Sequence, residues 1–458
     1  MAEYGSPFHA YDIRGRLGKE FSLEELGLCS FYIAQFFANR HTLCIGHDAR
    51  STSPIIAAHL LENVPVMAGV NVFNIGMCTT PQLYFSQWKL GLDCSIMITA
   101  SHNPPEYNGL KVTGRKGIPI GYANGLQKVE EAMVKQKVVL YPAVRAKDVF
   151  DVNTRQAYLN FLLKYGRERS LLKFATDCMH GAVGALVHEA LPEAVLFLND
   201  KPDGKFTEEG PNPTIASNRI QLQQAVLKER CDVGVIFDGD GDRVMFLDET
   251  GVLVPPDLLI VLIAEYFYRI KRRSKKRPVL VDIRTSKSVT EALHEMGVGV
   301  EVGRVGRVFM SNKLRNIKGL FGGELAGHYY YGDFNYFDSG LLTARIVLEA
   351  IEHLRAVGIT LHEWVMKTKR YENSGELNFQ VEEKRKVQLI ELLREHFTKQ
   401  EASVFASNED GYRIEFQDWW FSIRSSNTEP LLRLIVEARN EQMLKQKVEE
   451  ASRLILKA

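Results

Sequence analysis

The sequence has no apolar run approaching the ~20 residues that would cross a lipid bilayer. Its first residues, Met-Ala-Glu-Tyr-Gly-Ser, lack the basic and apolar regions of a secretory signal. It also has almost no net charge, because 57 Lys and Arg face 56 Asp and Glu, which gives +1 at pH 7. That balance implies no general attraction to nucleic acid or to an acidic membrane. We therefore expect a cytoplasmic protein without nucleic-acid or membrane partners.

Cysteine is scarce and shows no paired spacing typical of metal sites. The six cysteines are Cys29, Cys44, Cys78, Cys94, Cys178 and Cys231. Several of them lie in apolar runs, so we expect buried, reduced thiols and no disulfides.

The chain is long and apolar enough for several domains. It has 458 residues, 45% of them apolar, and a single core rarely grows beyond ~250–300 residues. We predict three similar α/β domains with mostly parallel mixed sheets plus a C-terminal α+β domain, arranged around a central cleft. The expected domains are 1–142, 143–249, 250–361 and 362–458.

Alternation of strands and helices carries this prediction. The first cycle has strands at 42–46, 70–75 and 93–98 and a helix at 55–63. The second has strands at 173–177, 194–198 and 232–237 and helices at 182–190 and 221–229. The third has a helix at 258–270 and strands at 279–283, 298–302 and 320–322. The last segment differs, with strands at 377–381, 413–417, 420–424 and 432–436, a helix at 383–398 and a closing amphipathic helix.

One strand of the first cycle runs directly into a polar turn. The apolar Ile96-Met-Ile98 is followed by Thr-Ala-Ser101-His-Asn-Pro104, and Pro104 favours a tight loop at this point. Ser101 is therefore expected at the carboxyl end of a strand, where open α/β sheets bind ligands. The alternative is ordinary turn chemistry, since Ser and Asn often bond their own backbone.

A second polar turn carries three carboxylates. Asp238, Asp240 and Asp242 alternate with glycines directly after an apolar strand, and they would repel one another without a cation. Hard oxygen ligands suit Mg²⁺. A calcium EF-hand fits less well, because Arg243 stands at the sixth position, where that loop needs Gly. A purely structural acidic turn is the remaining alternative.

Other polar segments have both a functional and a purely structural interpretation. In Gly322-Gly-Glu-Leu-Ala-Gly-His328, Glu324 could accept bonds from adjacent hydroxyls of a ligand and His328 could donate, or the segment is a glycine-rich turn. Arg424-Ser-Ser-Asn-Thr428 suits an oxyanion, or is a strand-end turn. Gly46-His-Asp-Ala-Arg50 follows a strand end, where it is either a capping turn or places Arg50 beside an active site. The basic run 271–277 is interpreted as a solvated surface.

Four motifs in order, Thr99-Ala-Ser-His-Asn-Pro104, Asp238-Gly-Asp-Gly-Asp-Arg243, Gly323-Glu-Leu-Ala-Gly-His328 and Arg424-Ser-Ser-Asn-Thr-Glu-Pro430, resemble those of the α-D-phosphohexomutase family, bacterial phosphomannomutase/phosphoglucomutase type. The resemblance runs from Tyr11-Asp-Ile-Arg-Gly15 to the last helix. It implies interconversion of hexose 1-phosphate and hexose 6-phosphate through a phosphoserine at Ser101 and a hexose 1,6-bisphosphate, which also serves as activator. It further implies Mg²⁺ held by Ser101, Asp238, Asp240 and Asp242, and a fourth domain that closes over the cleft.

The resemblance also assigns the remaining site residues. The implied catalytic residues are Ser101, His102, Lys111, Arg14 and Arg243. The implied substrate-binding residues are Tyr11, Arg284, Arg307, Glu324, Ala326, His328, Arg424, Ser426, Asn427 and Thr428. Three positions depart from the usual family pattern, because Ala326 replaces Ser, Arg307 replaces His and Val305 replaces Thr. A monomer or weak dimer is expected.

The preferred sugar follows only from local similarity. The stretch from Tyr329 to Gly340 resembles mannose and glucose mutases, and Leu325-Ala326 replaces the Gln-Ser pair common in glucosamine mutases. We expect mannose and/or glucose phosphates as substrates. Phosphoglucosamine mutase is the alternative enzyme, and a non-catalytic sugar-phosphate sensor is the alternative of another class, against which the intact catalytic positions argue.

Overall fold

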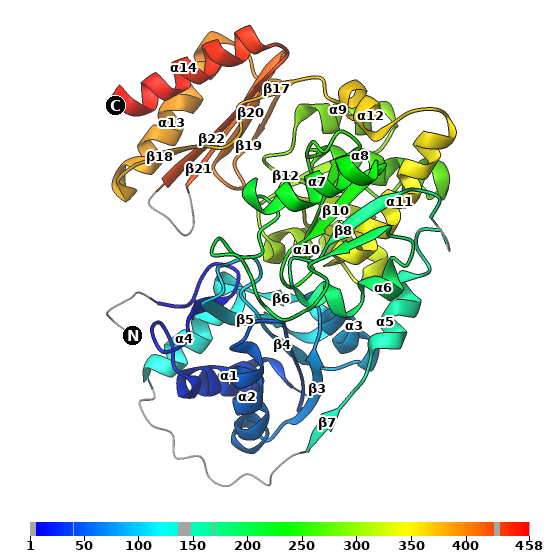
Figure 1. Cartoon of the computed structure of the whole chain (residues 1–458). Coiled ribbons are helices and arrows are strands. Elements are labelled where there is room, and N and C mark those ends of the chain that lie inside the picture. The colour runs from blue at the N-terminus through cyan, green and yellow to red at the C-terminus, as the bar shows by residue number, and fades with distance from the viewer. Residues whose placement is uncertain (1–5, 40, 136–147, 168–169, 426–430, 458) are drawn as a thin grey trace. The chain divides into compact units, whose positions relative to one another are not determined.

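The computed structural model describes residues 6–39, 41–135, 148–167, 170–425 and 431–457 (Figure 1). The chain divides into two compact units. The first unit consists of Met1–Val254 and Ala326–His362, and the second consists of Pro255–Leu325 and Glu363–Ala458. No helix among the described residues has the length and apolarity needed to cross a membrane.

The first unit contains a mixed seven-stranded sheet in the order β1-β5-β4-β2-β3-β7, with β6 beside β5. Strands β4, β2, β3 and β7 are parallel, whereas β1, β5 and β6 pair antiparallel. The predicted strands of the first cycle are confirmed. The sequence did not predict β5, because its Asn108-Gly109 pair is unusual in strands. The bounds are β1 (Ile13–Arg16), β2 (Thr42–His47), β3 (Asn71–Met77), β4 (Cys94–Ile98), β5 (Tyr107–Thr113), β6 (Pro119–Ile120) and β7 (Val149–Asp151).

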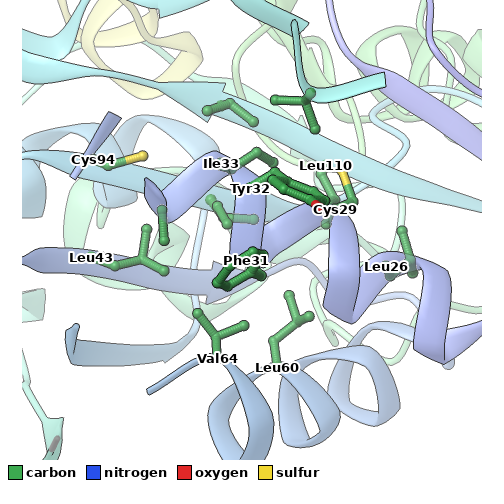
Figure 2. Close-up of a cluster of buried hydrophobic side chains, with 14 of the residues drawn as sticks. Leu26, Cys29, Phe31, Tyr32, Ile33, Leu43, Leu60, Val64, Cys94 and Leu110 are labelled. Carbon is green, nitrogen blue, oxygen red and sulfur yellow. The ribbon is translucent and has the colours of Figure 1, made fainter. Parts of the chain in front are cut away.

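Helices cover this sheet and bury its apolar strands. The first pair, α1 (Leu23–Phe37) and α2 (Ser53–Ala68), contact each other and share one core with β2, β4 and β5. Figure 2 shows side chains of that core, among them Phe31, Leu43, Leu60 and Leu110. The helix α4 (Gln127–Lys135) contacts α1, with η1 (Arg115–Gly117) and η2 (Tyr122–Leu126) before it. A separate small core lies under α3 (Thr80–Leu90).

A second sheet of the first unit has the order β11-β10-β8-β9. Its bounds are β8 (Phe174–Asp177), β9 (Leu196–Leu198), β10 (Val233–Phe237) and β11 (Val244–Asp248). Around it lie α5 (Arg155–Leu162), η3 (Ala182–Ala185), α6 (Val187–Ala190), η4 (Ser217–Arg219) and α7 (Ile220–Glu229). The continuous helix predicted at 182–190 is wrong, because it breaks at Leu186 into η3 and α6. Gly184 lies against the Asp200 backbone here, where a Cβ would come within 2.1 Å of the carbonyl oxygen.

The first unit is completed by a segment from much later in the chain. It contains β15 (Tyr329–Tyr331), η6 (Gly332–Phe334), β16 (Phe337–Asp338) and α11 (Gly340–Ala356). Strands β15 and β16 pair antiparallel, and α11 contacts β11 and α5. Just before β15, His328 forms a β-bridge with Arg243, so this segment packs beside the turn that follows β10.

The second unit begins with three parallel strands in the order β13-β12-β14. These are β12 (Val279–Asp282), β13 (Val300–Gly303) and β14 (Phe321–Gly323), with helices α8 (Leu258–Glu265), α9 (Lys287–Glu295) and α10 (Arg307–Asn316) around them. The predicted helix at 258–270 is confirmed, with α8 passing into a π-helical turn, η5 (Tyr266–Ile270). The helix α12 (Leu361–Thr368) lies where the chain passes from one unit to the other.

The C-terminal part of the second unit is an antiparallel sheet with two helices. The order is β17-β22-β21-β20-β19, with β18 beside β22. Helices α13 and α14 contact each other and share one core with the sheet, as predicted (Figure 1). The bounds are β17 (Glu372–Asn373), β18 (Leu377–Gln380), α13 (Glu383–Gln400), β19 (Phe405–Ser407), β20 (Tyr412–Glu415), β21 (Trp419–Ser425), β22 (Leu431–Ala438) and α14 (Glu441–Lys457).

Candidate active site

Ser101 stands on a sharp turn just beyond β4, as the sequence predicts. Its backbone adopts a left-handed conformation with φ 53°, and its amide donates to Thr99 Oγ1 at 2.8 Å. Left-handed non-glycine residues are uncommon and recur at functional sites, where the surrounding structure holds them. The residue is 1% exposed, and its hydroxyl donates to Asp238 Oδ2 at 3.0 Å. His102 Nδ1 lies 3.3 Å from the same hydroxyl oxygen.

Arg50 holds the backbone of this turn in place. Its guanidinium donates to the carbonyl oxygens of Ser101, Asn103, Pro104 and Tyr107 at 2.7–3.0 Å. Its Nε also donates to Asp48, at 3.2 Å. The buried guanidinium therefore satisfies four carbonyls of an irregular loop, which would otherwise lack partners. The arginine of the Gly46–Arg50 segment therefore lies beside the serine turn and bonds to its backbone.

The three aspartates converge directly after β10. Asp238, Asp240 and Asp242 are fully buried, and one carboxylate oxygen from each lies within 4.8 Å of the others. Gly239 allows this turn to approach the serine loop, because a Cβ there would meet the Ser101 carbonyl oxygen at 2.8 Å. The start of α3 also supports the turn, since Thr80 donates to Asp240 from both its backbone amide and its hydroxyl.

The electrostatics of this cluster favour an added cation. Burial, together with repulsion from Asp242 and Asp240, raises the pKa of Asp238 well above its usual value. Burial acts in the same direction on Asp242, but the cations Lys111 and Arg243 outweigh it and lower the pKa of Asp242. Asp240 Oδ1 and Asp242 Oδ1 are buried and accept no hydrogen bond from any described residue. Buried carboxylate oxygens without donors are the ligands that Mg²⁺ takes, so these residues fit a hard divalent ion.

Two predicted cations contact the site from the first sheet. Lys111 on β5 donates to Asp240 Oδ2 at 2.7 Å and also to Asp242. Burial alone would lower the pKa of Lys111, but these two carboxylates raise it, so the side chain stays charged. Arg14 on β1 donates to the side chain of Asn103 at 2.7 Å and is held by Asp12 at 2.8 Å. Strand β1 pairs with β5, and β5 with β4, which brings both cations to the serine turn.

His328 and Arg243 form a hydrogen-bonded chain. Arg243 Nε donates to His328 Nε2 at 2.8 Å and lies 3.8 Å from Asp238 Oδ2. Because an arginine can only donate, His328 Nε2 is an acceptor, and the ring proton lies on Nδ1. That nitrogen is 2.8 Å from Asp338 Oδ2, to which it donates. Both ring nitrogens of His328, which was predicted to contact substrate, are therefore occupied within the first unit.

His102 has a different environment. Burial is the largest influence on this imidazole, and the cations Arg243, Arg14 and Lys111 add to it, so its pKa lies well below its usual range. A neutral imidazole beside the Ser101 hydroxyl can accept a proton.

The second unit assembles another group of predicted residues. Arg284 is held by Asp282 through two bonds of 2.7 and 3.2 Å, and it lies 3.9 Å from Glu324. Glu324 accepts the backbone amide of Gly306 at 2.9 Å. Arg307, the first residue of α10, is 7% exposed and follows directly. Within this unit, the bond from Gly306 to Glu324 therefore brings the end of β14 next to the start of α10.

The predicted oxyanion grip lies in the same unit. Arg424, on β21, donates to Glu376 Oε2 at 3.1 Å. Burial raises the pKa of Asp410. Three guanidinium groups act in the opposite direction and favour the charged carboxylate, namely Arg424, Arg304 and Arg284. Arg304 lies 3.7 Å from Asp410. Arg284 and Arg424, two of the three arginines expected for sugar and phosphate binding, are therefore electrostatic neighbours of Asp410.

The remaining predicted residues carry less information. Ser426, Asn427 and Thr428 lie outside the described residues. Tyr11 is half-buried just before β1, and Ala326 is half-buried in the turn that leads to His328. The sequence did not single out Asp12, Thr80, Asp338, Asp282 or Asp410. Asp12 and Asp282 each hold an arginine two residues later in the chain. Asp338 lies ten residues from its partner, whereas the partners of Thr80 and Asp410 are more distant in sequence. Among such supporting segments, only Asp48-Ala-Arg50, at a strand end, gave a signal.

Four sequence profiles of one family match this chain in order. Described as phosphoglucomutase/phosphomannomutase α/β/α domains I, II and III and C-terminal domain, they match residues 5–138, 156–251, 255–371 and 376–454. The chain belongs to this family. It is therefore a mutase enzyme that acts on hexose phosphates, and the predicted fold is the family's four-domain arrangement of mixed α/β sheets.

Individual members of the phosphoglucomutase/phosphomannomutase family match over nearly the full length. A phosphomannomutase of Methanocaldococcus jannaschii is 34% identical over 98% of this chain and 97% of that protein. A phosphomannomutase of Escherichia coli K12 is 32% identical over 95% of each. A family protein from Burkholderia thailandensis has the same fold, with a TM-score of 0.86 at 24% identity over 98% of this chain and 96% of that one. An N-acetylphosphoglucosamine mutase of Aspergillus fumigatus, solved with glucose 1,6-bisphosphate, matches at a TM-score of 0.55 and 14% identity over 99% of this chain and 96% of that one.

Proposed function

We propose that this phosphohexomutase works through a phosphoserine at Ser101 and a hexose 1,6-bisphosphate. The observation that carries the proposal is the 3.0 Å hydrogen bond from the Ser101 hydroxyl to Asp238, which joins the serine turn to the aspartate turn from a distant part of the chain. A serine placed in this way lies where a phosphoryl group would meet both an acidic cluster and several cations. That combination suits phosphoryl transfer, which depends on positioning and on charge stabilisation.

The transfer would proceed at phosphorus in both directions. The bond between phosphorus and the Ser101 oxygen breaks as a bond forms from phosphorus to a hydroxyl of the hexose monophosphate, which gives the bisphosphate. The reverse transfer, from the other end of the sugar, restores phosphoserine and releases the isomer. His102 is placed to accept the proton of the attacking hydroxyl, because its Nδ1 lies beside the Ser101 hydroxyl, whereas Lys111 is kept protonated by its bonds to Asp240 and Asp242. Arg14 and Arg243 would stabilise the charge on the transferring group.

Mg²⁺ is the proposed cofactor, held by Asp238, Asp240, Asp242 and the phosphorylated Ser101. The buried oxygens of Asp240 and Asp242 that accept no hydrogen bond from described residues support this assignment. When bound, the ion would withdraw charge from the phosphoryl group. Lys111 would still contact the other oxygens of Asp240 and Asp242, which keeps both carboxylates in fixed orientations.

Sugar and phosphate recognition is assigned to the second unit. Glu324 would accept bonds from sugar hydroxyls, and Arg424 would bind the phosphate that is not reacting. Mannose and glucose phosphates are the proposed substrates. We further propose that the four domains meet near residues 142, 249 and 361, and that the fourth domain closes over bound substrate, excluding water.

Intact-mass measurement tests the phosphoserine. Part of the purified enzyme should carry one phosphoryl group, located on Ser101 by peptide mapping, and glucose 1,6-bisphosphate should raise that fraction. Ser101→Ala should stay unmodified and lose turnover by on the order of 10⁴-fold or more. Ser217→Ala, an exposed serine, is the matched control and should behave like the wild type. Enzyme that turns over but never carries phosphate on Ser101 would refute the proposal.

A substrate panel tests the sugar. Mannose, glucose and glucosamine 1-phosphates are assayed with Mg²⁺ and catalytic glucose 1,6-bisphosphate, comparing kcat/KM. Mannose or glucose 1-phosphate should be converted fastest. A preference for glucosamine 1-phosphate would reassign the substrate while leaving the phosphoserine chemistry intact.

A further inference from the structure

A cavity of about 410 Å³ lies at the carboxyl ends of β3 and β7 in the first unit. Its walls come from the end of β3, the first turn of α3, the segment from β7 to the start of α5, and Ala185 at the end of η3. The parallel strands run in the order β4-β2-β3-β7, so the cavity lies along the same sheet edge as Ser101 but two strands further from β4. This is the edge at which α/β sheets bind ligands, and the volume is in the range of small-molecule sites.

Gln82 presents an unused amide to this cavity. The residue is 6% exposed, yet its side-chain amide makes no hydrogen bond to any residue in the described part of the chain. Its backbone, in contrast, is fully used, because the amide donates to Thr79 Oγ1 and the carbonyl accepts from Ser86 Oγ. Because this amide lines the cavity and makes no bond within the described part of the chain, it offers both donors and an acceptor to a ligand.

The charges around the cavity select against anions. Arg155 donates its guanidinium to Glu189 and to the Ala185 carbonyl, so its charge is already compensated. Asp151 accepts from Asn74 at 2.8 Å through Oδ1, which leaves Oδ2 for a ligand. A sugar phosphate would be repelled by this carboxylate, whereas the hydroxyl of a neutral ligand would donate to it.

A third group completes a set suited to hydroxyls. Asn153 accepts the backbone amide of Arg155 through its side-chain oxygen at 3.0 Å, and its amide nitrogen remains available as a donor. Gln82 and Asn153 can therefore donate to hydroxyl oxygens while Asp151 accepts from a hydroxyl group. A ligand with several neighbouring hydroxyls can satisfy both kinds of partner at once, because each hydroxyl both donates and accepts.

We propose that this cavity is a second ligand site, which binds a neutral polyhydroxylated molecule of the size of an unphosphorylated hexose. The site is separate from Ser101 and does not depend on the phosphoserine mechanism. Its selectivity is opposite to that expected of the active site, because it accepts the neutral sugar and rejects the phosphate ester.

Binding of D-mannose and D-glucose to the intact enzyme tests the site, by ligand-observed NMR and by calorimetry. Glucose 6-phosphate is kept at saturating concentration, so that the active site is blocked. Saturable hexose binding should persist, and Gln82→Ala should weaken it about fivefold to tenfold through the loss of one amide. Gln156→Ala, on α5 and outside the cavity, is the matched control and should bind like the wild type.

Three results would overturn the proposal: no saturable binding of either hexose, displacement of the hexose by glucose 6-phosphate, or unchanged binding in Gln82→Ala. The thermal midpoint of each variant is measured first, to show that it is folded. If Gln82→Ala is unstable, Asn153→Ala replaces it, because Asn153 is exposed. It should likewise weaken hexose binding, and unchanged binding in that variant would count against the site.

Discussion

The candidate sites of the two units of this enzyme differ in the charge that they offer to a ligand. Around Ser101, three buried aspartates leave two carboxylate oxygens that accept no hydrogen bond from described residues. In the second unit the cations are held by carboxylates, as in the pairs Arg284–Asp282 and Arg424–Glu376. The first arrangement has capacity for a cation, and the second would orient guanidinium groups for the proposed phosphate. Changes in the first unit should therefore lower kcat, and changes in the second should raise KM.

The largest expected effect tests the acidic side of this comparison. Asp240→Asn removes one negative charge from the cluster while preserving its shape, so kcat should fall on the order of 10³-fold with little change in sugar-phosphate affinity. Steady-state kinetics and equilibrium binding of glucose 6-phosphate measure the two quantities separately. Asp333→Asn, in η6 and outside the cluster, serves as the charge-matched control. An equal loss of turnover and of affinity would mean that the aspartate turn is only structural.

The serine turn should depend on Arg50 next. Arg50→Lys keeps the positive charge but cannot reproduce the four bonds to loop carbonyls. The free energy of unfolding should fall by about 2–4 kcal/mol, measured by urea unfolding, and kcat should fall because Ser101 is no longer held. Arg16→Lys is the control, since Arg16 bonds mainly to Glu20 at the surface of the turn after β1. If Arg50→Lys were destabilised but kept the wild-type kcat, Arg50 would stabilise the fold without positioning Ser101 for catalysis.

A buried acid of the second unit should make the stability of the protein depend on pH. Burial raises the pKa of Asp257 from 3.8 to about 6, while its carboxylate accepts the backbone amides of Ser286 and Leu258. Because the folded state favours the protonated acid, the stabilisation from this group is complete below pH 3.8 and is lost as pH rises through 6. The shift corresponds to about 3 kcal/mol.

Urea unfolding of wild type and Asp257→Asn between pH values of about 4 and 7 measures this loss. The stability difference between them should decline as pH rises, because only the wild type ionises. Asp418→Asn, whose side chain is 52% exposed, should show a flat difference. A flat profile for Asp257→Asn would contradict the raised pKa.

The smallest expected effect concerns the anion side. Arg424→Ala should raise KM for the sugar phosphate about tenfold to a hundredfold, with kcat nearly unchanged, because one charged contact to the non-reacting phosphate is lost. Arg433→Ala is a close control, since Arg433 binds the same Glu376 at 3.1 Å. If both variants raise KM equally, the effect comes from releasing Glu376 and not from the loss of a phosphate ligand.

Local patterns allowed most of the elements and the polar turns to be predicted. Apolar runs followed by Ser101 or Asp238 placed both at strand ends, since periodicity and turn residues depend only on neighbours in the chain. Strand β5 and the break at Leu186 were missed. The first contains Asn-Gly. The second lies in a segment where Gly184 packs against Asp200, a contact between residues that no local pattern reveals.

The supporting partners of the site could not be predicted for a similar reason. Asp338 orients His328 from ten residues away, and Thr80 contacts Asp240 from another element. A single Asp or Thr carries no signal about a distant partner, because such bonds depend on how β10, α3 and the β15–β16 hairpin pack.

By itself, the sequence determined which functional groups this enzyme carries: a serine on a tight turn, three alternating carboxylates, and arginines at later turns. Only the tertiary structure decided that Ser101 and Asp238 share a hydrogen bond, that Arg50 acts on backbone carbonyls, and that Gln82 faces a cavity with no partner among the described residues. The physical reason is that residue identity sets charge and hydrogen-bonding capacity, whereas distance and burial, which determine the strength of each interaction, arise only when remote segments pack together.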